Sequence, residues 1–187
     1  MISSKKSEQK IASSVDIAGE QRDGLRSTGI QLSSEANGPF FKTVYQALSK
    51  AFKAYCGLFS ELSEQNASFE AFGVYRYQDS TERYVWHADG ADPGLRYRFA
   101  SMVLYLNSVE EGGETGFKYF SQKISPEEGA LLVFPAGWTS IHQARPPISG
   151  PKYVLITWIC VIHRHPFIIM WCHEQRNSAA IKVGGPL

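Results

Sequence analysis

His87 and Asp89 stand two positions apart, and His142 follows 53 residues after Asp89. Residues i and i+2 of a β-strand point to the same side, so His87 and Asp89 can share one face of a strand. His142 must then come from another strand that passes close to the first. Two histidines and one carboxylate form the facial ligand set that binds non-haem Fe(II) and leaves other metal positions open. The spacing therefore predicts a β-rich fold that encloses a metal.

The apolar pattern divides the chain into a helical part and a longer β part. From Pro39 to Phe59 apolar residues recur at helical spacing, and proline is favoured near a helix start. After residue 70, short apolar runs between turn signals predict strands at 72–77, 84–88, 99–106, 116–120, 130–134, 140–144 and 153–161. Residues 22–32 predict a short strand or turn, and 166–172 an edge strand or packing arm. Many short strands behind one helix are typical of a sandwich or a jelly-roll barrel.

The length of 187 residues suits one domain with a real core. We expect a single domain over 1–187, with its core at about 70–162 and disordered ends at 1–20 and 174–187. Nineteen basic against eighteen acidic residues argue against nucleic acid or an anionic membrane as a partner. Three scattered cysteines favour a reducing compartment, and neither a signal peptide nor a membrane-spanning run is visible. The expectation is a cytoplasmic protein, and no oligomeric state is predicted.

An ordered series of motifs surrounds the three candidate ligands. The series runs Tyr77, His87-Ala88-Asp89, Arg98, Glu111-Gly112-Gly113-Glu114-Thr115, His142, Gly150-Pro151-Lys152-Tyr153 and Trp158. In order and spacing, residues 72–160 resemble the prolyl 4-hydroxylase-like branch of the 2-oxoglutarate/Fe(II) dioxygenases. The resemblance implies a mainly β fold with flanking helices. That fold is a double-stranded β-helix, a jelly roll with the iron at one open end.

The resemblance also implies roles for individual residues. His87, Asp89 and His142 would be the iron ligands and the catalytic centre. Lys152, ten positions after His142, would pair with the distal carboxylate of 2-oxoglutarate, since a lysine ammonium is a compact charge. The other residues implied for the co-substrate side are Tyr77, Thr115 and Trp158. Tyr75 stays an alternative to Tyr77, because the segment up to His87 is one residue longer than the family pattern.

The substrate side is implied to include Tyr84 and Arg98, and we expect Trp86 and Trp138 near the open mouth as well. The implied reaction is hydroxylation of an aliphatic C–H, favoured as that of a prolyl residue in a peptide or protein. It would use Fe(II), 2-oxoglutarate and O₂, with ascorbate as reductant. Cys160 departs from the basic residue that peptidyl-prolyl hydroxylases often carry there.

Several alternatives stay open. A hydroxylase of free amino acids or other small molecules fits the same metal site, and a non-catalytic jelly-roll binding module would use its histidines structurally. A nucleic-acid demethylase of the same superfamily is disfavoured because Lys152 stands where such enzymes carry arginines. Lys152 and Gly112-Gly113 could also belong to surface turns, Tyr84 and Arg98 to the barrel rim, and Trp158 to the core. The tail residues His163, His165, Cys172 and His173 lack the spacing of a zinc site, so we predict that they are exposed to solvent.

Overall fold

A computed structural model describes residues 27–59 and 67–161 of the chain. The predicted disordered ends, the arm at 166–172 and the tail histidines lie outside these residues. The described elements, in chain order, are β1 (Thr28–Leu32), α1 (Ser34–Cys56), β2 (Ala67–Phe69), β3 (Phe72–Tyr77), β4 (Tyr84–His87), β5 (Arg98–Tyr105), β6 (Thr115–Phe117), β7 (Lys123–Ile124), β8 (Leu131–Pro135), the 3₁₀ turn η2 (Trp138–Ser140), β9 (His142–Ala144) and β10 (Lys152–Val161).

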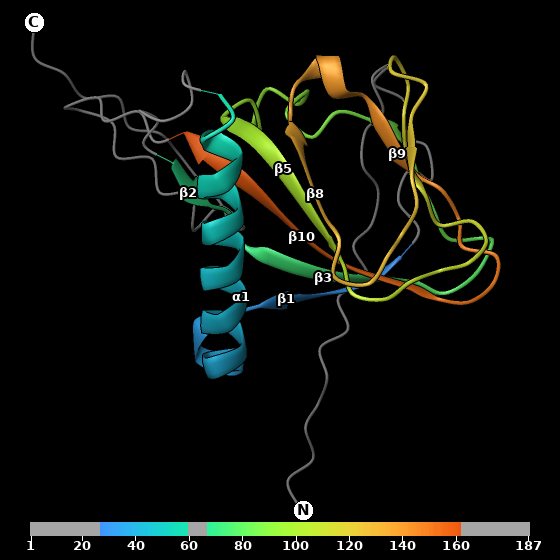
Figure 1. The fold of residues 1–187 in the computed structure, drawn as a ribbon, viewed down its shortest axis with the longest axis horizontal. Helices are drawn as coiled ribbons and strands as arrows, with labels where there is room; N and C mark the ends of the chain where they lie inside the picture. The colour runs from blue at the N-terminus through green and yellow to red at the C-terminus, as the bar shows by residue number, and fades with distance from the viewer. Residues whose placement is uncertain (1–26, 60–66, 162–187) are drawn as a thin grey trace, which may run out of the picture.

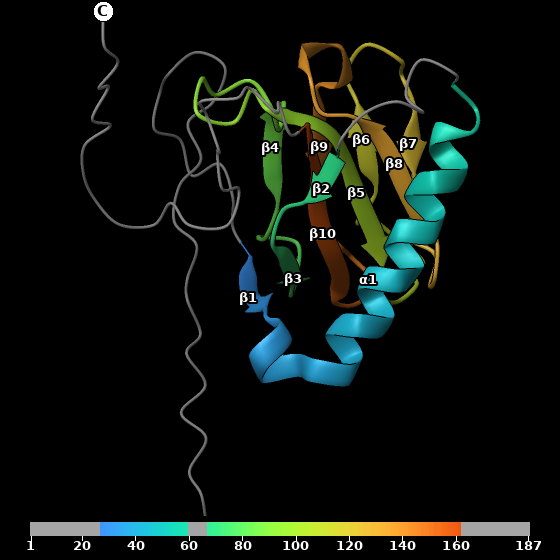
Figure 2. The same ribbon diagram turned by 90° about the vertical axis from the view of Figure 1, so that its left-hand side faces the viewer.

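These strands form two antiparallel sheets (Figures 1 and 2). The larger sheet has the order β1-β3-β10-β5-β8, and β2 pairs with the far end of β10. The smaller sheet has the order β4-β9-β6-β7. Strands distant in sequence therefore become neighbours, as β3, β5 and β10 do in the larger sheet. This is the mainly β architecture that the sequence predicts.

Helix α1 covers the outer face of the larger sheet (Figure 2). Its buried residues Val44 and Leu48 pack with Phe72, Met102 and Leu155 of the sheet. Their spacing is helical, which explains why the apolar pattern identified this segment. The regular helix begins at Pro39 as predicted, but an extra turn from Ser34 precedes it across a kink at Gly38, where φ is 21°.

Alternation along β10 separates the core under α1 from an inner face. Leu155 and Ile159 point to the helix side and are 0% and 1% exposed. The even-numbered residues from Lys152 to Trp158 point the other way and line a pocket between the sheets. A strand of period two thus contributes to both layers, because successive side chains leave opposite faces.

Two short strands were not predicted from the sequence. β2 spans three residues and β7 only two, which is too short for an alternating pattern to emerge. β3 has its predicted bounds, β1 occupies the end of the predicted 22–32 segment, and β6 ends three residues before its predicted end. The other strands differ from their predicted bounds by one or two residues, as at β9, where η2 takes the first positions. No helix in the described part of the chain combines the length and the apolar character needed to cross a membrane.

Candidate metal centre

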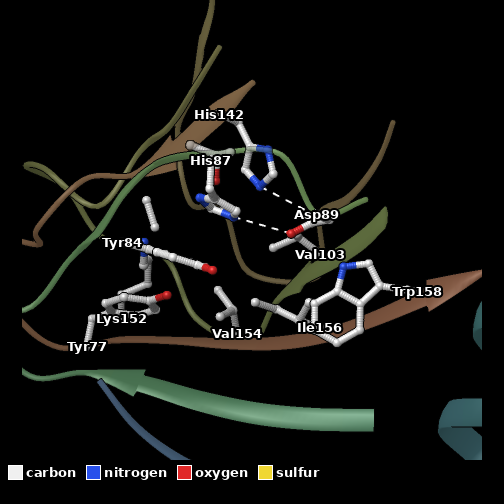
Figure 3. Close-up of a pocket in the computed structure, with 12 residues that line it drawn as sticks. Tyr77, Tyr84, His87, Asp89, Val103, His142, Lys152, Val154, Ile156 and Trp158 are labelled. Atoms are coloured by element: carbon white, nitrogen blue, oxygen red, sulfur yellow. Dashed lines mark ion pairs between the residues drawn. The ribbon is translucent and has the colours of Figure 1, made fainter. Parts of the chain in front are cut away.

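His87, Asp89 and His142 meet at the inner face, and their potential ligand atoms all lie within 4.8 Å of one another (Figure 3). Nε2 of His87 is 3.3 Å from Oδ1 of Asp89, and Nε2 of His142 is 3.7 Å from Oδ2 of Asp89. Two ligands at right angles on one metal, each about 2.1 Å away, lie about 3 Å apart. All three side chains are buried. The donor set therefore fits a single metal ion.

Pairing of β4 with β9 places the two histidines opposite each other. His87 ends β4, His142 begins β9, and the two are partners in the ladder. Asp89 departs from the sequence-based expectation, because it lies two residues beyond the end of β4 and not on the strand. The backbone fixes it there, since Gly90 N donates to Ala136 O at 2.8 Å. A turn that is hydrogen-bonded to the residue after β8 thus places Asp89 beside the histidines, where strand alternation was expected to place it.

Backbone carbonyls set the orientation of both imidazoles. Nδ1 of His87 lies 2.8 Å from the carbonyl oxygen of Val85, and Nδ1 of His142 lies 3.0 Å from that of Ser140. A carbonyl can only accept, so each Nδ1 carries a hydrogen, and Nε2 is the atom that keeps the lone pair in the neutral ring. Both Nε2 atoms face Asp89. A hydrogen bond at the outer nitrogen is what metal-ligating histidines ordinarily make.

Electrostatics favour the protonation states that a metal requires. Burial lowers the pKa of His142 to about 4, although the nearby Asp89 acts in the opposite direction, so the ring is neutral at physiological pH. Burial by itself would raise the pKa of Asp89, but His142, His87 and a hydrogen bond from Ser101 outweigh it and hold that pKa well below its usual range. A neutral imidazole and an ionised carboxylate are the ligand forms.

Lys152 lies in the same pocket with its whole side chain buried, at 1% exposure. Its Nζ donates to the carbonyl oxygen of Gly113 at 2.9 Å and lies 4.3 Å from the centroid of the Tyr77 ring. Gly113 has φ of 74°, a left-handed conformation that glycine adopts readily. Besides forming a turn, this glycine provides the carbonyl oxygen that accepts the hydrogen bond from Lys152. Lys152 is the one lysine or arginine among the residues that line the pocket.

The pocket contains about 450 Å³ of empty space, including its open mouth. Its walls come from both sheets and consist of Tyr77, Tyr84, His87, Asp89, Val103, Thr115, His142, Ala144, Lys152, Val154, Ile156 and Trp158. Thr115 is buried, and its Oγ1 accepts a hydrogen bond from the hydroxyl of Tyr105 at 2.7 Å. The hydroxyl hydrogen of Thr115 is therefore left to donate to another acceptor.

The structure separates the two tyrosines that the sequence left as alternatives. Tyr77 lines the pocket and stands directly opposite Lys152 in the pairing of β3 with β10. The ring of Tyr75 lies over two glycines, since a Cβ added at Gly29 or Gly73 would come within 2.8 or 2.6 Å of it. Tyr75 is thus placed flat on the sheet, and Tyr77 is the tyrosine beside Lys152.

A β-bulge brings Tyr84 to the same face as His87. Tyr84 pairs with Ala144 and His87 pairs with His142, so three steps along β4 match two steps along β9. Such a bulge restores a common face to residues at an odd separation. The ring of Tyr84 stacks on that of His87 with centroids 3.5 Å apart, and it crosses the pocket in Figure 3.

Arg98 is placed differently from the substrate-side role predicted for it. Its Nε and Nη2 donate to the two carboxylate oxygens of Glu70 at 2.7 and 2.6 Å, and its guanidinium stacks 3.6 Å from the ring centroid of Trp158. A third donor, Nη1, lies 3.3 Å from the backbone oxygen of Asp89. Arg98 is therefore committed to a buried ion pair behind the pocket wall.

Two other residues expected near the mouth do not line the pocket. Neither Trp86 nor Trp138 is among the described residues of its wall, and Trp138 is 74% exposed. Nη1 of Arg145 lies 3.8 Å from Oε1 of Glu114, and its side chain is partly exposed. By contrast, Trp158 does form a wall, and its buried Nε1 has no hydrogen-bond partner among the described residues.

Sequence reasoning missed Ser101, Tyr105 and Glu70. Ser101 and Tyr105 lie on the inner face of β5, where a polar residue in an apolar strand was a usable signal. Glu70 carried no local signal, because its partner Arg98 is 28 positions away.

The binding of a dianionic co-substrate is expected to depend on pH through Lys152. Burial lowers the pKa of this ammonium to about 8, with Glu114 partly opposing the shift. A bound carboxylate favours the charged form, so binding should draw a proton from solution wherever the empty site is deprotonated. Affinity for 2-oxoglutarate should be steady below pH 8 and fall as pH rises above it.

Calorimetry in buffers of different ionisation enthalpy measures this uptake directly. We expect about 0.9 proton taken up at pH 9 and about 0.1 at pH 7, which follows from a pKa near 8. The same titration with Lys152→Ala should show no such difference. Equal proton uptake at both pH values in the parent protein would contradict the assignment.

Comparison with known proteins agrees with this geometry. Residues 72–160 match the sequence model of the 2OG-Fe(II) oxygenase superfamily. Prolyl 4-hydroxylase 13 of Arabidopsis thaliana is 32% identical over 118 residues, which are 49% of this chain and 43% of that protein. The chain thus spans less than half the length of the curated relatives it matches.

Solved structures show the same fold. The viral collagen prolyl hydroxylase of Paramecium bursaria Chlorella virus-1, in its 2OG complex, superimposes with a TM-score of 0.61 at 24% identity, covering 74% of this chain and 81% of that one. A prolyl hydroxylase from Trichoplax adhaerens, in complex with a hypoxia inducible factor peptide fragment, has a TM-score of 0.61 at 17% identity, covering 80% and 70%. The predicted double-stranded β-helix is confirmed by these likenesses and by the two sheets.

Proposed function

We propose that this chain, whose residues 72–160 match the 2OG-Fe(II) oxygenase superfamily, hydroxylates an aliphatic C–H of a prolyl residue in a peptide or protein. The observation that carries the proposal is the presence of a three-ligand metal centre and one buried lysine in a single pocket. Iron, when bound, supplies the activation of O₂ that is coupled to conversion of 2-oxoglutarate to succinate and CO₂. His87, Asp89 and His142 hold that metal, and ascorbate serves as reductant.

Lys152 anchors the distal carboxylate of 2-oxoglutarate in this proposal. The ammonium is fully buried, and no described carboxylate lies within ion-pair distance of it. A buried charge without a counter-charge is costly, so the site is arranged to receive an anion. Thr115 supports the same end of the co-substrate with its remaining hydroxyl hydrogen, and Tyr77 closes the wall beside the ammonium.

A peptide fits the rest of the pocket better than a free amino acid. A free amino acid brings a second carboxylate, yet Lys152 is the one cation of the lining and Arg98 is already paired with Glu70. What the wall offers instead is the ring of Tyr84 and the indole of Trp158, whose Nε1 lacks a partner among the described residues. Aromatic faces suit a pyrrolidine ring, and an N–H suits an uncharged carbonyl. The names of the relatives favour the same substrate.

Mass spectrometry of candidate substrates tests the proposal. Proline-rich peptides and free proline are incubated with Fe(II), 2-oxoglutarate and ascorbate, and each is examined for a gain of about 16 Da, one oxygen atom. We expect the gain on a prolyl residue of a peptide, dependent on both iron and 2-oxoglutarate, and none with Asp89→Ala. A gain on free proline alone would replace the peptide substrate by a small molecule. No gain on any candidate, with no 2-oxoglutarate consumed, would favour a binding module.

A further inference from the structure

The two oxygens of the Asp89 carboxylate have different neighbours. Oδ1 lies 3.3 Å from Nε2 of His87, on the side where the metal ligands converge. Oδ2 accepts a hydrogen bond from the hydroxyl of Ser101 at 2.5 Å. A short hydrogen bond from a hydroxyl to a carboxylate is among the stronger ones that proteins make. Oδ2 is therefore engaged by Ser101 and also lies 3.7 Å from Nε2 of His142, whereas Oδ1 faces His87.

Ser101 stands at a position where packing alone would favour an apolar residue. It is 0% exposed in the middle of β5, and its neighbours Ala100 and Met102 belong to the core under α1. Across the sheet it pairs with Trp158 on one side and Phe134 on the other. A buried hydroxyl must find a partner, and here that partner is the carboxylate 12 positions earlier in the chain.

We propose that Ser101 is a positioning residue for the metal centre. Its hydroxyl holds Oδ2 and thereby fixes the rotation of the Asp89 carboxylate, so that Oδ1 stays directed toward His87. The proposal rests on the proposed metal site and deepens it. Asp89 needs such support because it sits in a turn beyond β4 and has no strand to fix its side chain.

The chemical consequence concerns the number of positions left at the metal. A facial triad works by leaving positions open for co-substrate and O₂. A carboxylate free to rotate can use both oxygens and would occupy one of those positions. The hydrogen bond from Ser101 restrains that rotation of the carboxylate. It also keeps a partner for the buried negative charge when no metal is present, which limits the cost of burial.

A matched pair of variants distinguishes the effect of the hydroxyl group from the effect of the volume that the side chain occupies. Ser101→Thr and Ser101→Val have nearly the same shape, and both suit a strand, but only threonine keeps a hydroxyl. Ser101→Ala removes the oxygen without adding any atom. The affinity of each purified, metal-free protein for Co(II) is measured by calorimetry, and the thermal unfolding of the same metal-free samples shows that they are folded.

We expect Ser101→Val and Ser101→Ala to bind Co(II) about 10- to 100-fold more weakly than the parent, the usual effect of losing an outer partner of a metal ligand. Ser101→Thr should stay close to the parent. Equal affinities for the threonine and valine variants would overturn the proposal, and so would an unchanged affinity of Ser101→Ala. If the added methyl groups prevent folding, the alanine variant alone decides. Failure of the parent to bind Co(II) or Fe(II) would instead contradict the proposed function.

Discussion

Replacing His87 by alanine is expected to abolish metal binding and turnover together. His87 supplies one of the three donors found among the described residues, and its Nε2 lies 3.3 Å from the carboxylate that completes the site. Loss of even an outer partner of a ligand costs about 10- to 100-fold in affinity, so loss of the ligand itself should exceed about 100-fold. Fe(II) or Co(II) affinity by calorimetry and 2-oxoglutarate consumption are measured on the same preparation.

His173→Ala is the matched control, since it removes a histidine that the sequence places outside the ligand set. This control should bind metal as the parent does. A His87→Ala protein that is folded by circular dichroism and still turns over 2-oxoglutarate would show that the metal lies elsewhere. Loss of turnover with unchanged metal affinity would remove His87 from the ligand set.

Replacing Lys152 by alanine is expected to raise the 2-oxoglutarate requirement sharply and leave metal affinity nearly unchanged. Among the described residues, Lys152 is the one lysine or arginine that lines the pocket, and its side chain is buried. Removing one partner of a buried charge pair costs about 2–5 kcal/mol, and at about 1.4 kcal/mol per tenfold the lower figure already means about 30-fold in affinity. The KM for 2-oxoglutarate and the calorimetric Kd for Co(II) are compared.

Lys123→Ala serves as control, because Lys123 is an exposed lysine on β7 and does not line the pocket. It should leave both quantities unchanged. If Lys152→Ala uses 2-oxoglutarate as well as the parent, another cation holds that carboxylate, and Arg145 is the next to test. An equal loss of metal affinity would mean that Lys152 supports the fold of the whole centre.

The sequence predicted the centre better than it predicted what supports it. His87 and His142 could be found because metal binding requires those residue types, and Lys152 because its place ten positions after His142 resembles the family pattern. Asp89 was found too, but for a reason that the structure corrects, since it lies past the end of β4. Spacing alone cannot distinguish a strand that continues from a turn that brings a side chain to the same point.

Most of what the sequence did not predict consists of contacts between residues far apart in the chain. Arg98 was expected to face substrate, whereas it is held by Glu70 across 28 positions and stacks on Trp158. Neither contact leaves a periodic pattern in the sequence, because each depends on how separate segments of the chain pack together. Ser101 and Tyr105 stood out as polar residues in an apolar strand, but their partners Asp89 and Thr115 were visible only in the structure. Local pattern predicts the elements, and side-chain pairing between them follows from the assembled sheets.

The bulge on β4 has a consequence for how such a pocket can vary by insertion and deletion. Because three steps on β4 match two on β9, one extra residue before His87 is absorbed inside the strand. Deleting Val85 should therefore give a regular strand in which residue 84 and the histidine still share a face. Adding one residue more at the same place should carry Tyr84 farther along the strand, out of stacking distance of the histidine, while the two histidines stay paired. Chain length in this segment, as well as residue type, thus decides which side chain walls the site.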